Sequence, residues 1–228
     1  MRVKILAVDT STEACSAALL SDGEVTERFQ LAPREHATLI LPMVESLLAE
    51  AGLALGRLDA LAFGRGPGAF TGVRIGTGVV QGLAFGAELP VVPVSSLAAI
   101  AQGTWRELGA ERVLAAIDAR IQEVYWGTYR RGDSGVMELS GQELVCRPGE
   151  VPVPADGGWF GAGTGWGAYG DELRARVGAA LDRCEAERFP HAADIAVLAV
   201  EGLRRGLAVP AEQALPVYLR DEVAWKKA

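Results

Sequence analysis

Two aspartates stand at positions where paired carboxylates do chemistry. Asp9 and Asp118 each end a buried apolar run, and each is followed by a turn and a second strand pattern. In duplicated folds that split nucleotides, carboxylates at such positions face a cleft and handle metal-bound phosphate. The plainer alternative is that each aspartate only caps a turn. The weak candidates for a nucleotide-binding site are therefore Asp9, Thr10, Ser11 and Asp118.

The sequence lacks the residues that a metal site or a catalytic nucleophile would need. The only two histidines, His36 and His191, are far apart, and neither has a histidine or cysteine partner at a metal-ligand spacing. The same scarcity leaves a serine or cysteine nucleophile without a base, and Gly-x-Ser-x-Gly does not occur. The chain has three widely spaced cysteines, Cys15, Cys146 and Cys184, and no Cys-x-x-Cys pair. Such cysteines are typical of free thiols in a reducing compartment. We expect no catalytic residue, no bound metal and no cofactor.

The segment 64–78 contains six glycines and follows a strand pattern, an order that often brings a backbone close to a phosphate. The spacing excludes both common phosphate-binding motifs. A Walker loop needs a lysine, and none lies between Lys4 and Lys226. The dinucleotide motif would need glycine where the chain has Ala69 or Thr71. The glycines are therefore expected to allow close packing of something other than phosphate.

Two helix patterns leave more apolar surface than one sheet can cover. In 71–86, five glycines and three apolar residues share an arc of roughly 160°, and the glycines cost about 4–5 kcal/mol of helix propensity. In 36–51, apolar residues cover roughly 200°, although a surface helix needs about 100°. We predict a subunit interface in which two such helix pairs form a four-helix bundle; the alternative is a larger internal core. The interface residues would be Leu39, Ile40, Met43, Leu47, Gly72, Ile75, Gly76, Val79 and Leu83.

Bulk composition limits the partners. The chain has 228 residues, a net charge of −7 and no basic cluster, so it is a poor nucleic-acid binder on its own. No run of 18 apolar residues occurs, and the apolar run near the N-terminus is too short for a signal peptide. We expect a cytoplasmic protein with no membrane contact.

The order of patterns predicts an α/β fold in two related halves. Three strands, a helix, a strand, a helix, a strand and a helix fill 1–108. The pattern restarts in 109–211 with three strand patterns, and a clear helix follows at 192–205. This order favours two mixed-sheet domains, the second smaller. The tail 212–228 is expected to pack on the first domain.

Several motifs resemble one family over nearly the whole chain. They are Asp9-Thr10-Ser11, Arg65-Gly66-Pro67-Gly68-Ala69-Phe70-Thr71-Gly72, Gly82-Leu83-Ala84, Asp118-Ala119-Arg120, Gly163-Thr164-Gly165-Trp166 and Pro216-Val217-Tyr218-Leu219-Arg220 with Val223-Ala224-Trp225-Lys226-Lys227. The set is similar to the actin–sugar kinase–chaperone superfold, which is ribonuclease H-like, and more narrowly to the TsaB (YeaZ) family.

The resemblance implies a role in tRNA modification. Members of the family act with a catalytic paralogue, TsaD, and an ATPase, TsaE, which together transfer threonylcarbamoyl from its adenylate to the adenosine beside the anticodon. The paralogue's metal-ligand positions are Ser96 and Ile100 here, and isoleucine cannot bind a metal. The resemblance thus implies a non-catalytic subunit that docks the paralogue through its N-terminal helices, pairs with a second copy when alone, and meets tRNA only within the complex.

Two other functions stay open at this point. A stand-alone ATP-dependent phosphotransferase or nuclease of the same superfold would use Asp9 and Asp118. A peptidase would fit an old glycoprotease label for the family, but the sequence offers no nucleophile and base to support it.

Overall fold

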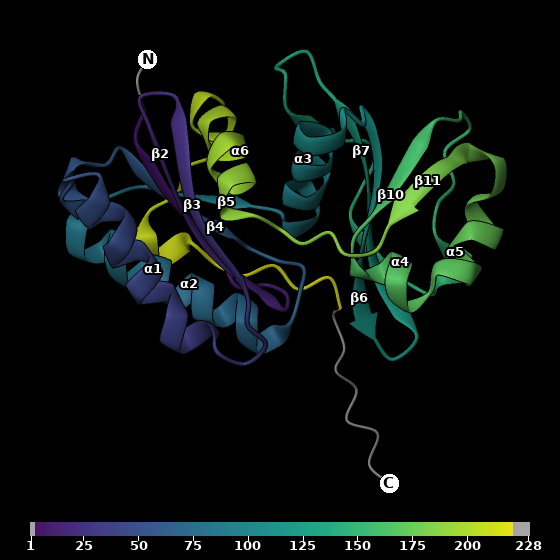
Figure 1. The fold of residues 1–228 in the computed structure, drawn as a ribbon, viewed down its shortest axis with the longest axis horizontal. Coiled ribbons are helices and arrows are strands. Elements are labelled where there is room, and N and C mark those ends of the chain that lie inside the picture. Colours follow the sequence, from purple (N-terminus) through teal and green to yellow (C-terminus); the bar gives the residue numbers. More distant parts are fainter. Residues whose placement is uncertain (1–2, 221–228) are drawn as a thin grey trace, which may run out of the picture.

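The computed structural model describes residues 3–220, which form two lobes side by side (Figure 1). The first lobe has a five-stranded sheet in the order β3-β2-β1-β4-β5. Its strands are β1 (Ile5–Asp9), β2 (Ala14–Ser21), β3 (Glu24–Leu31), β4 (Ala60–Gly64) and β5 (Val91–Val94). The β1–β2 and β2–β3 pairs are antiparallel, whereas β1–β4 and β4–β5 are parallel.

The second lobe repeats this topology. Its sheet has the order β11-β10-β6-β7-β8, with β9 also paired to β7. The strands are β6 (Arg112–Arg120), β7 (Glu123–Arg131), β8 (Met137–Leu139), β9 (Leu144–Cys146), β10 (Trp159–Ala162) and β11 (Leu181–Glu185). The predicted α/β fold with two related mixed sheets is therefore confirmed.

The helices of the first half are α1 (His36–Glu50), α2 (Phe70–Ala87) and α3 (Ser96–Leu108); those of the second are α4 (Thr164–Ala168), α5 (Gly170–Val177) and α6 (Ala192–Arg204). Ser95 begins α3 as its N-cap, because the side chain accepts hydrogen bonds from two backbone amides of the first turn. None of the helices in 3–220 combines the length and the hydropathy that a membrane span requires.

Two helices lie on the sheet of the other half. Helix α3 follows β5 but packs on β6, β7, β8 and β10, and α6 packs on β1, β2, β4 and β5. The prediction that 192–211 belongs with the second domain is therefore wrong for α6. The buried face of α6 is made of small residues and one isoleucine, Ala192, Ile195, Ala196 and Ala199, and it meets alanines of the first sheet. A sequence pattern shows that a helix has such a face, but not which sheet receives it.

The tail contacts both lobes as far as it is described. Val217 N donates to Arg65 O at 2.8 Å, and Gln81 Nε2 donates to Ala214 O at 3.1 Å, both in the first lobe. The guanidinium of Arg220 then donates to Ala119 O in the second lobe at 3.1 Å. The prediction that the tail packs on the first domain thus misses its second contact, and 221–228 lie outside the described residues.

Candidate functional site

A cavity of about 760 Å³ lies between the lobes, where the tips of two hairpins face the start of α2. Four separate segments line it: Ser11–Glu13 from the β1–β2 hairpin, Gly68–Phe70 before and at the start of α2, Ile117–Arg120 from the β6–β7 hairpin, and the tail at Tyr218 and Arg220, with Arg74 and Tyr125 completing the wall. We call it the cleft cavity. Of the four nucleotide candidates, Ser11 and Asp118 line it.

The other two candidates face inward, away from the cavity. Asp9 is 1 % exposed, and its carboxylate accepts hydrogen bonds from Ser11 N at 2.9 Å and Ser11 Oγ at 3.0 Å. The Thr10 hydroxyl donates to the backbone oxygen of Gly72 at 2.7 Å, which ties the first hairpin to α2. Asp9 and Thr10 therefore fix the hairpin rather than offer groups to a ligand.

Burial sets the protonation of Asp9. Removal from water raises the pKa of this carboxyl to about 7, against the opposing hydrogen bonds from Ser11. Because the pKa is higher in the folded than in the unfolded chain, the folded state binds the proton more tightly. The resulting stabilisation is complete below the ordinary pKa of about 4 and disappears as the pH rises through 7.

We therefore expect Asp9→Asn to stabilise the protein at pH 8 by about 2 kcal/mol, and to have a much smaller effect at pH 5, where the wild-type carboxyl is already protonated. Urea unfolding of both proteins at the two pH values measures the difference. A variant that is equally destabilised at both values would contradict this account of Asp9.

The carboxylate of Asp118 already accepts hydrogen bonds from within its own hairpin. Its carboxylate accepts from Arg120 N and Arg120 Nη1, each at 2.8 Å, and from the Tyr169 hydroxyl at 3.3 Å. The same Arg120 also reaches Glu13 of the first lobe at 3.2 Å, across the mouth of the cavity. The carboxylates of Asp9 and Asp118 thus do not face a common site that a ligand could reach.

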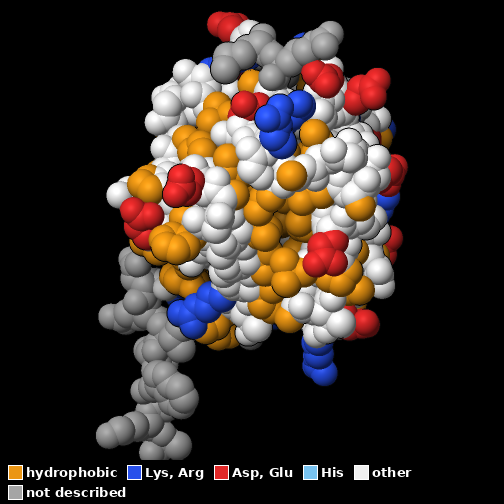
Figure 2. Space-filling model, turned by 90° about the vertical axis from the view of Figure 1, so that its left-hand side faces the viewer, with side chains coloured by type: hydrophobic (Ala, Val, Ile, Leu, Met, Phe, Trp, Pro, Cys, Tyr) orange, Lys and Arg blue, Asp and Glu red, His pale blue; other side chains and the backbone are white. Residues whose placement is uncertain are grey.

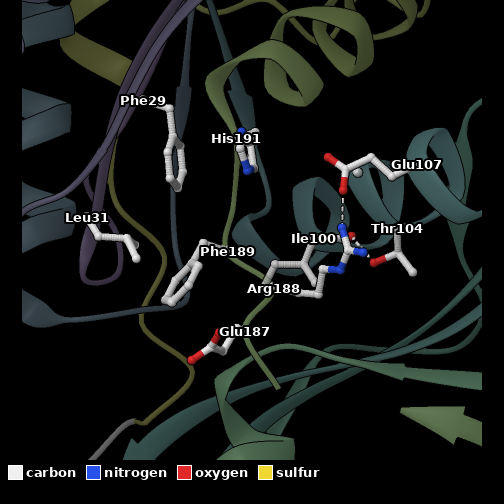
Figure 3. Close-up of a pocket in the computed structure, with 10 residues that line it drawn as sticks. Phe29, Leu31, Ile100, Thr104, Glu107, Glu187, Arg188, Phe189 and His191 are labelled. Atoms are coloured by element: carbon white, nitrogen blue, oxygen red, sulfur yellow. Dashed lines mark hydrogen bonds and ion pairs between the residues drawn. The ribbon is translucent and has the colours of Figure 1, made fainter. Parts of the chain in front are cut away.

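A second cavity, of about 360 Å³, lies where β3, α3 and the segment before α6 meet (Figure 3). The ring of His191 stacks on Phe29 with 4.1 Å between centroids, and its Nδ1 lies 2.9 Å from Glu27. Burial lowers the pKa of His191, but the Glu27 carboxylate outweighs it, so the pKa lies above its ordinary value. Arg188 is turned toward Glu107, with which it forms an ion pair. The His191–Glu27 pair thus fixes the start of α6 to β3, and the Arg188–Glu107 pair fixes the preceding segment to α3.

No three metal-ligating side chains cluster anywhere in 3–220. The other histidine, His36, is buried at the start of α1, with Nε2 2.9 Å from Thr12 O. Ser96 and Ile100, which the resemblance places at the metal-ligand positions of the paralogue, are buried in α3. Both histidines thus have structural contacts that account for them.

The predicted interface on α1 and α2 divides into inner and outer residues. A Cβ at Gly76 would lie 2.7 Å from Thr10 Oγ1, and one at Gly72 would collide with Thr10 O. The absence of side chains at these two positions therefore lets the β1–β2 hairpin pack directly against α2. Ile40 and Leu47 are no more than 1 % exposed, within the core of the first lobe. The prediction that these four residues belong to an exposed interface is therefore wrong, because the chain itself covers them.

The outer residues form what we call the helical face. It consists of five partly buried side chains beside two glycines where an added Cβ would have no neighbour within 4 Å outside its own stretch of helix: Leu39, Met43, Ile75, Val79 and Leu83, with Gly78 and Gly82. Figure 2 looks onto this side of the molecule and shows apolar side chains gathered at its centre, with charged ones scattered around them. At its margin Phe85 is 79 % exposed and Leu41 is 42 % exposed, and neither was among the predicted interface residues. An aromatic residue between glycines was the available signal for Phe85.

The comparisons with known proteins agree with one another. The family model described as TsaD, tRNA N6-adenosine threonylcarbamoyltransferase, matches residues 29–228. The tRNA threonylcarbamoyladenosine biosynthesis protein TsaB of Escherichia coli (strain K12) is 50% identical, across 99% of this chain and 98% of its own length. The protein of the same name from Haemophilus influenzae is 45% identical, across 98% of this chain and 96% of its own.

A solved structure is also similar over nearly the whole chain. YeaZ from Pseudomonas aeruginosa is 55% identical and superposes with a TM-score of 0.88, covering 95% of this chain and 100% of that one. The two-lobed fold is thus the actin-like, ribonuclease H-like fold that the sequence predicts. With these matches spanning nearly its full length, the chain belongs to the TsaB (YeaZ) family of tRNA threonylcarbamoyladenosine biosynthesis proteins.

Proposed function

We propose that the chain is a non-catalytic subunit of a cytoplasmic complex that makes threonylcarbamoyladenosine in tRNA. In this complex the catalytic paralogue TsaD and the ATPase TsaE carry out the transfer from threonylcarbamoyl-AMP, and this chain supports the paralogue. The names of the relatives support the pathway. The net charge of −7 supports contact with tRNA only within the complex, because phosphate binding needs a basic surface.

The helical face is the observation that carries the proposal. Five apolar side chains are left only partly covered by the chain, and the two open glycines beside them remove side chains that would keep another helix at a distance. Packing α1 and α2 against the equivalent helix pair of a related subunit would give a four-helix bundle and bury this surface. A paralogue with the same fold offers such a pair.

The same face supports the proposal that the chain also pairs with itself. A patch that matches a related helix pair also matches its own copy, and two copies would then meet around a twofold axis. We propose that a homodimer forms through the helical face when the paralogue is absent, and that the paralogue displaces the second copy.

The geometry of the cleft supports a non-catalytic role over a phosphotransferase or nuclease. Such an enzyme would need Asp9 and Asp118 together and available. Asp9 is buried and bonded to Ser11, and Asp118 is saturated by Arg120 and Tyr169. The catalytic steps are therefore assigned to the paralogue.

Gly82→Leu tests the interface. Residue 82 is open, so leucine leaves the fold intact and improves helix propensity, yet its side chain stands where a partner helix would pack. We expect the affinity for the paralogue to fall at least about 100-fold, with no fall in melting temperature.

Gly82→Ala is the matched control, because it makes the same gain in helix propensity with little added bulk. Both variants are compared with wild type by calorimetric titration with the paralogue. If Gly82→Leu binds as tightly as wild type, the helical face is not the docking surface.

A further inference from the structure

Strand β3 leaves one edge of the first sheet open. It pairs with β2 alone among the described strands, and the hydrogen bond from Ala32 N to Glu13 O, 3.0 Å long, fixes which of its backbone groups face β2. In an antiparallel pair, every second residue directs its N–H and C=O away from the neighbouring strand. On β3 these residues are Val25, Glu27, Phe29 and Leu31.

The outward backbone groups of Phe29 and Leu31 have no hydrogen-bond partner within 3–220. At the opposite edge of the sheet, by contrast, Val91 of β5 exchanges two backbone hydrogen bonds of 2.8 Å with Val209. Strand β3 also lacks the proline and lysine residues that often keep an edge strand from pairing. It is therefore a template on which an extended segment adds through backbone hydrogen bonds.

The cavity of about 360 Å³ lies against this part of the edge (Figure 3). Phe29 and Leu31 line it and are 37 % and 54 % exposed, and Phe189 and Ile100 contribute further apolar surface. Directly opposed residues of neighbouring strands place their side chains on the same face of a sheet. Two alternate residues of an added strand would thus hold their side chains over the cavity, beside Phe29 and Leu31.

A helix fits this place less well than a strand. Its own N–H and C=O groups are already paired, so it would leave the outward groups of β3 unsatisfied. The open edge and the cavity together therefore favour an extended segment.

The charges around the cavity leave one acidic group open. Arg188 is paired with Glu107, and His191 is bonded to Glu27. Glu187, which also lines the cavity, is exposed and forms no ion pair within 3–220. An occupant that complements this cavity therefore carries a basic side chain close to its apolar ones.

We propose that an extended segment of a partner protein adds to the outer edge of β3, with two alternate apolar side chains over the cavity and a lysine or arginine beside Glu187. The backbone bonds select a strand, the cavity selects its apolar side chains, and the open carboxylate selects its charge. The site involves no residue of the helical face, so the inference stands whether or not the paralogue docks there.

Selection from a random library supplies a probe for this edge. Phage that display peptides of about twelve residues, long enough for a strand and its flanks, are selected on the purified full chain. We expect the enriched peptides to alternate apolar residues and to include lysine or arginine. One enriched peptide is synthesised with a fluorescent label, and anisotropy titration gives its dissociation constant.

Leu31→Pro tests pairing with the edge. Proline removes the outward N–H and places its ring where the peptide backbone would bind, so the affinity for the labelled peptide should fall at least about ten-fold. Leu139→Pro is the matched control and should leave the affinity unchanged. Leu139 ends β8, an edge strand of the second sheet, and it too is exposed and directs its N–H away from the neighbouring strand. Melting temperatures show whether both variants are folded.

Glu187→Lys tests the charge. It should weaken binding of the labelled peptide at least about five-fold, because it brings like charges together. Glu172→Lys makes the same change at an exposed position on α5 that does not line the cavity, and it should have no effect.

Amide exchange of the wild-type complex, followed by NMR, shows whether a strand is added. Addition predicts exchange at least about ten-fold slower at the amides of Phe29 and Leu31, with little change at Gln30, whose N–H already faces β2. This alternation separates strand pairing from docking of side chains alone, and it does not depend on the stability of any variant.

Four results would overturn the proposal. If no peptide is enriched that prefers the wild type to Leu31→Pro, the edge does not accept a strand. Protection at other elements, or protection without the alternation, would place the peptide at another site. Binding that is insensitive to Glu187→Lys would remove the charge pairing. Dimers of Gly82→Leu that dissociate when Leu31→Pro is added would assign the edge to a second copy of this chain.

Discussion

Gly72→Ala should lower the free energy of unfolding by about 3 kcal/mol or more. The added Cβ would overlap the backbone oxygen of Thr10 and lie 3.2 Å from its carbonyl carbon. Neither atom can rotate away, because Thr10 is 1 % exposed and its hydroxyl is bonded to Gly72 O. The first hairpin would have to move away from α2, and the hydrogen bond between them would lengthen or break. A loss of this size lowers the melting temperature by roughly 6–12 °C in a protein of this length.

Gly82→Ala is the same substitution ten residues later on the same helix, and it should have the opposite sign. Nothing lies within 4 Å of a Cβ at this position, so alanine should raise the free energy of unfolding by about 0.5–1 kcal/mol through helix propensity alone. Urea unfolding of the two variants in one buffer measures both effects. If Gly72→Ala is as stable as Gly82→Ala, then α2 does not pack on Thr10 as described.

Arg106→Met should destabilise the protein by about 3–5 kcal/mol, because it leaves a buried carboxylate without its partner. Asp194 is fully buried at the start of α6, and its carboxylate accepts from Arg106 Nε at 2.9 Å and Nη2 at 3.0 Å. Arg106 belongs to α3 on the second sheet, whereas α6 lies on the first. This ion pair therefore joins the two lobes where their helices meet.

The pH dependence separates loss of charge pairing from loss of packing. Burial raises the pKa of Asp194 even beside Arg106, and without the arginine it should rise further. A raised pKa stabilises the folded state at low pH and ceases to do so as the pH rises. The defect of Arg106→Met should therefore be smallest in acid and grow above the ordinary aspartate pKa of about 4. Adding Asp194→Asn should recover much of the stability at pH 8, and no recovery would show that packing dominates.

Local pattern predicted the strands and hairpins well. Asp22-Gly23 forms the tight turn between β2 and β3, with positive φ at both residues, as an Asp-Gly pair between two strand patterns predicts. Alternation and apolar runs act within a strand and its neighbour, so a sequence reveals them. The repeat of strand order in the two lobes follows from the same patterns.

Helical periodicity does not show which other element covers a given face of a helix. Helical spacing predicts one glycine surface on α2, yet a Cβ at Gly72 or Gly76 would meet Thr10, whereas one at Gly78 or Gly82 would have no neighbour within 4 Å. Helical spacing places residues around an axis, but the sheet and hairpin that cover them come from distant parts of the chain. The destination of α6 was missed for the same reason.

The cleft cavity depends on contacts that have no local signal. Its walls come from four segments between Ser11 and Arg220, brought together only by the whole fold. Asp9 had the residue type and the position of a catalytic carboxylate. Its burial beneath Ser11, which decides its role, is a tertiary property.

The central claim is that the helical face docks the catalytic paralogue, and hydrogen exchange of this chain with and without the paralogue tests it most directly. Exchange is measured at saturating concentrations, where both proteins are present as the complex. The account predicts protection of at least about ten-fold in residues 39–50 and 75–86, with little change in β8 and β11 at the edges of the second sheet. Protection confined to the second lobe, with the helical face exchanging as in the free chain, would contradict it.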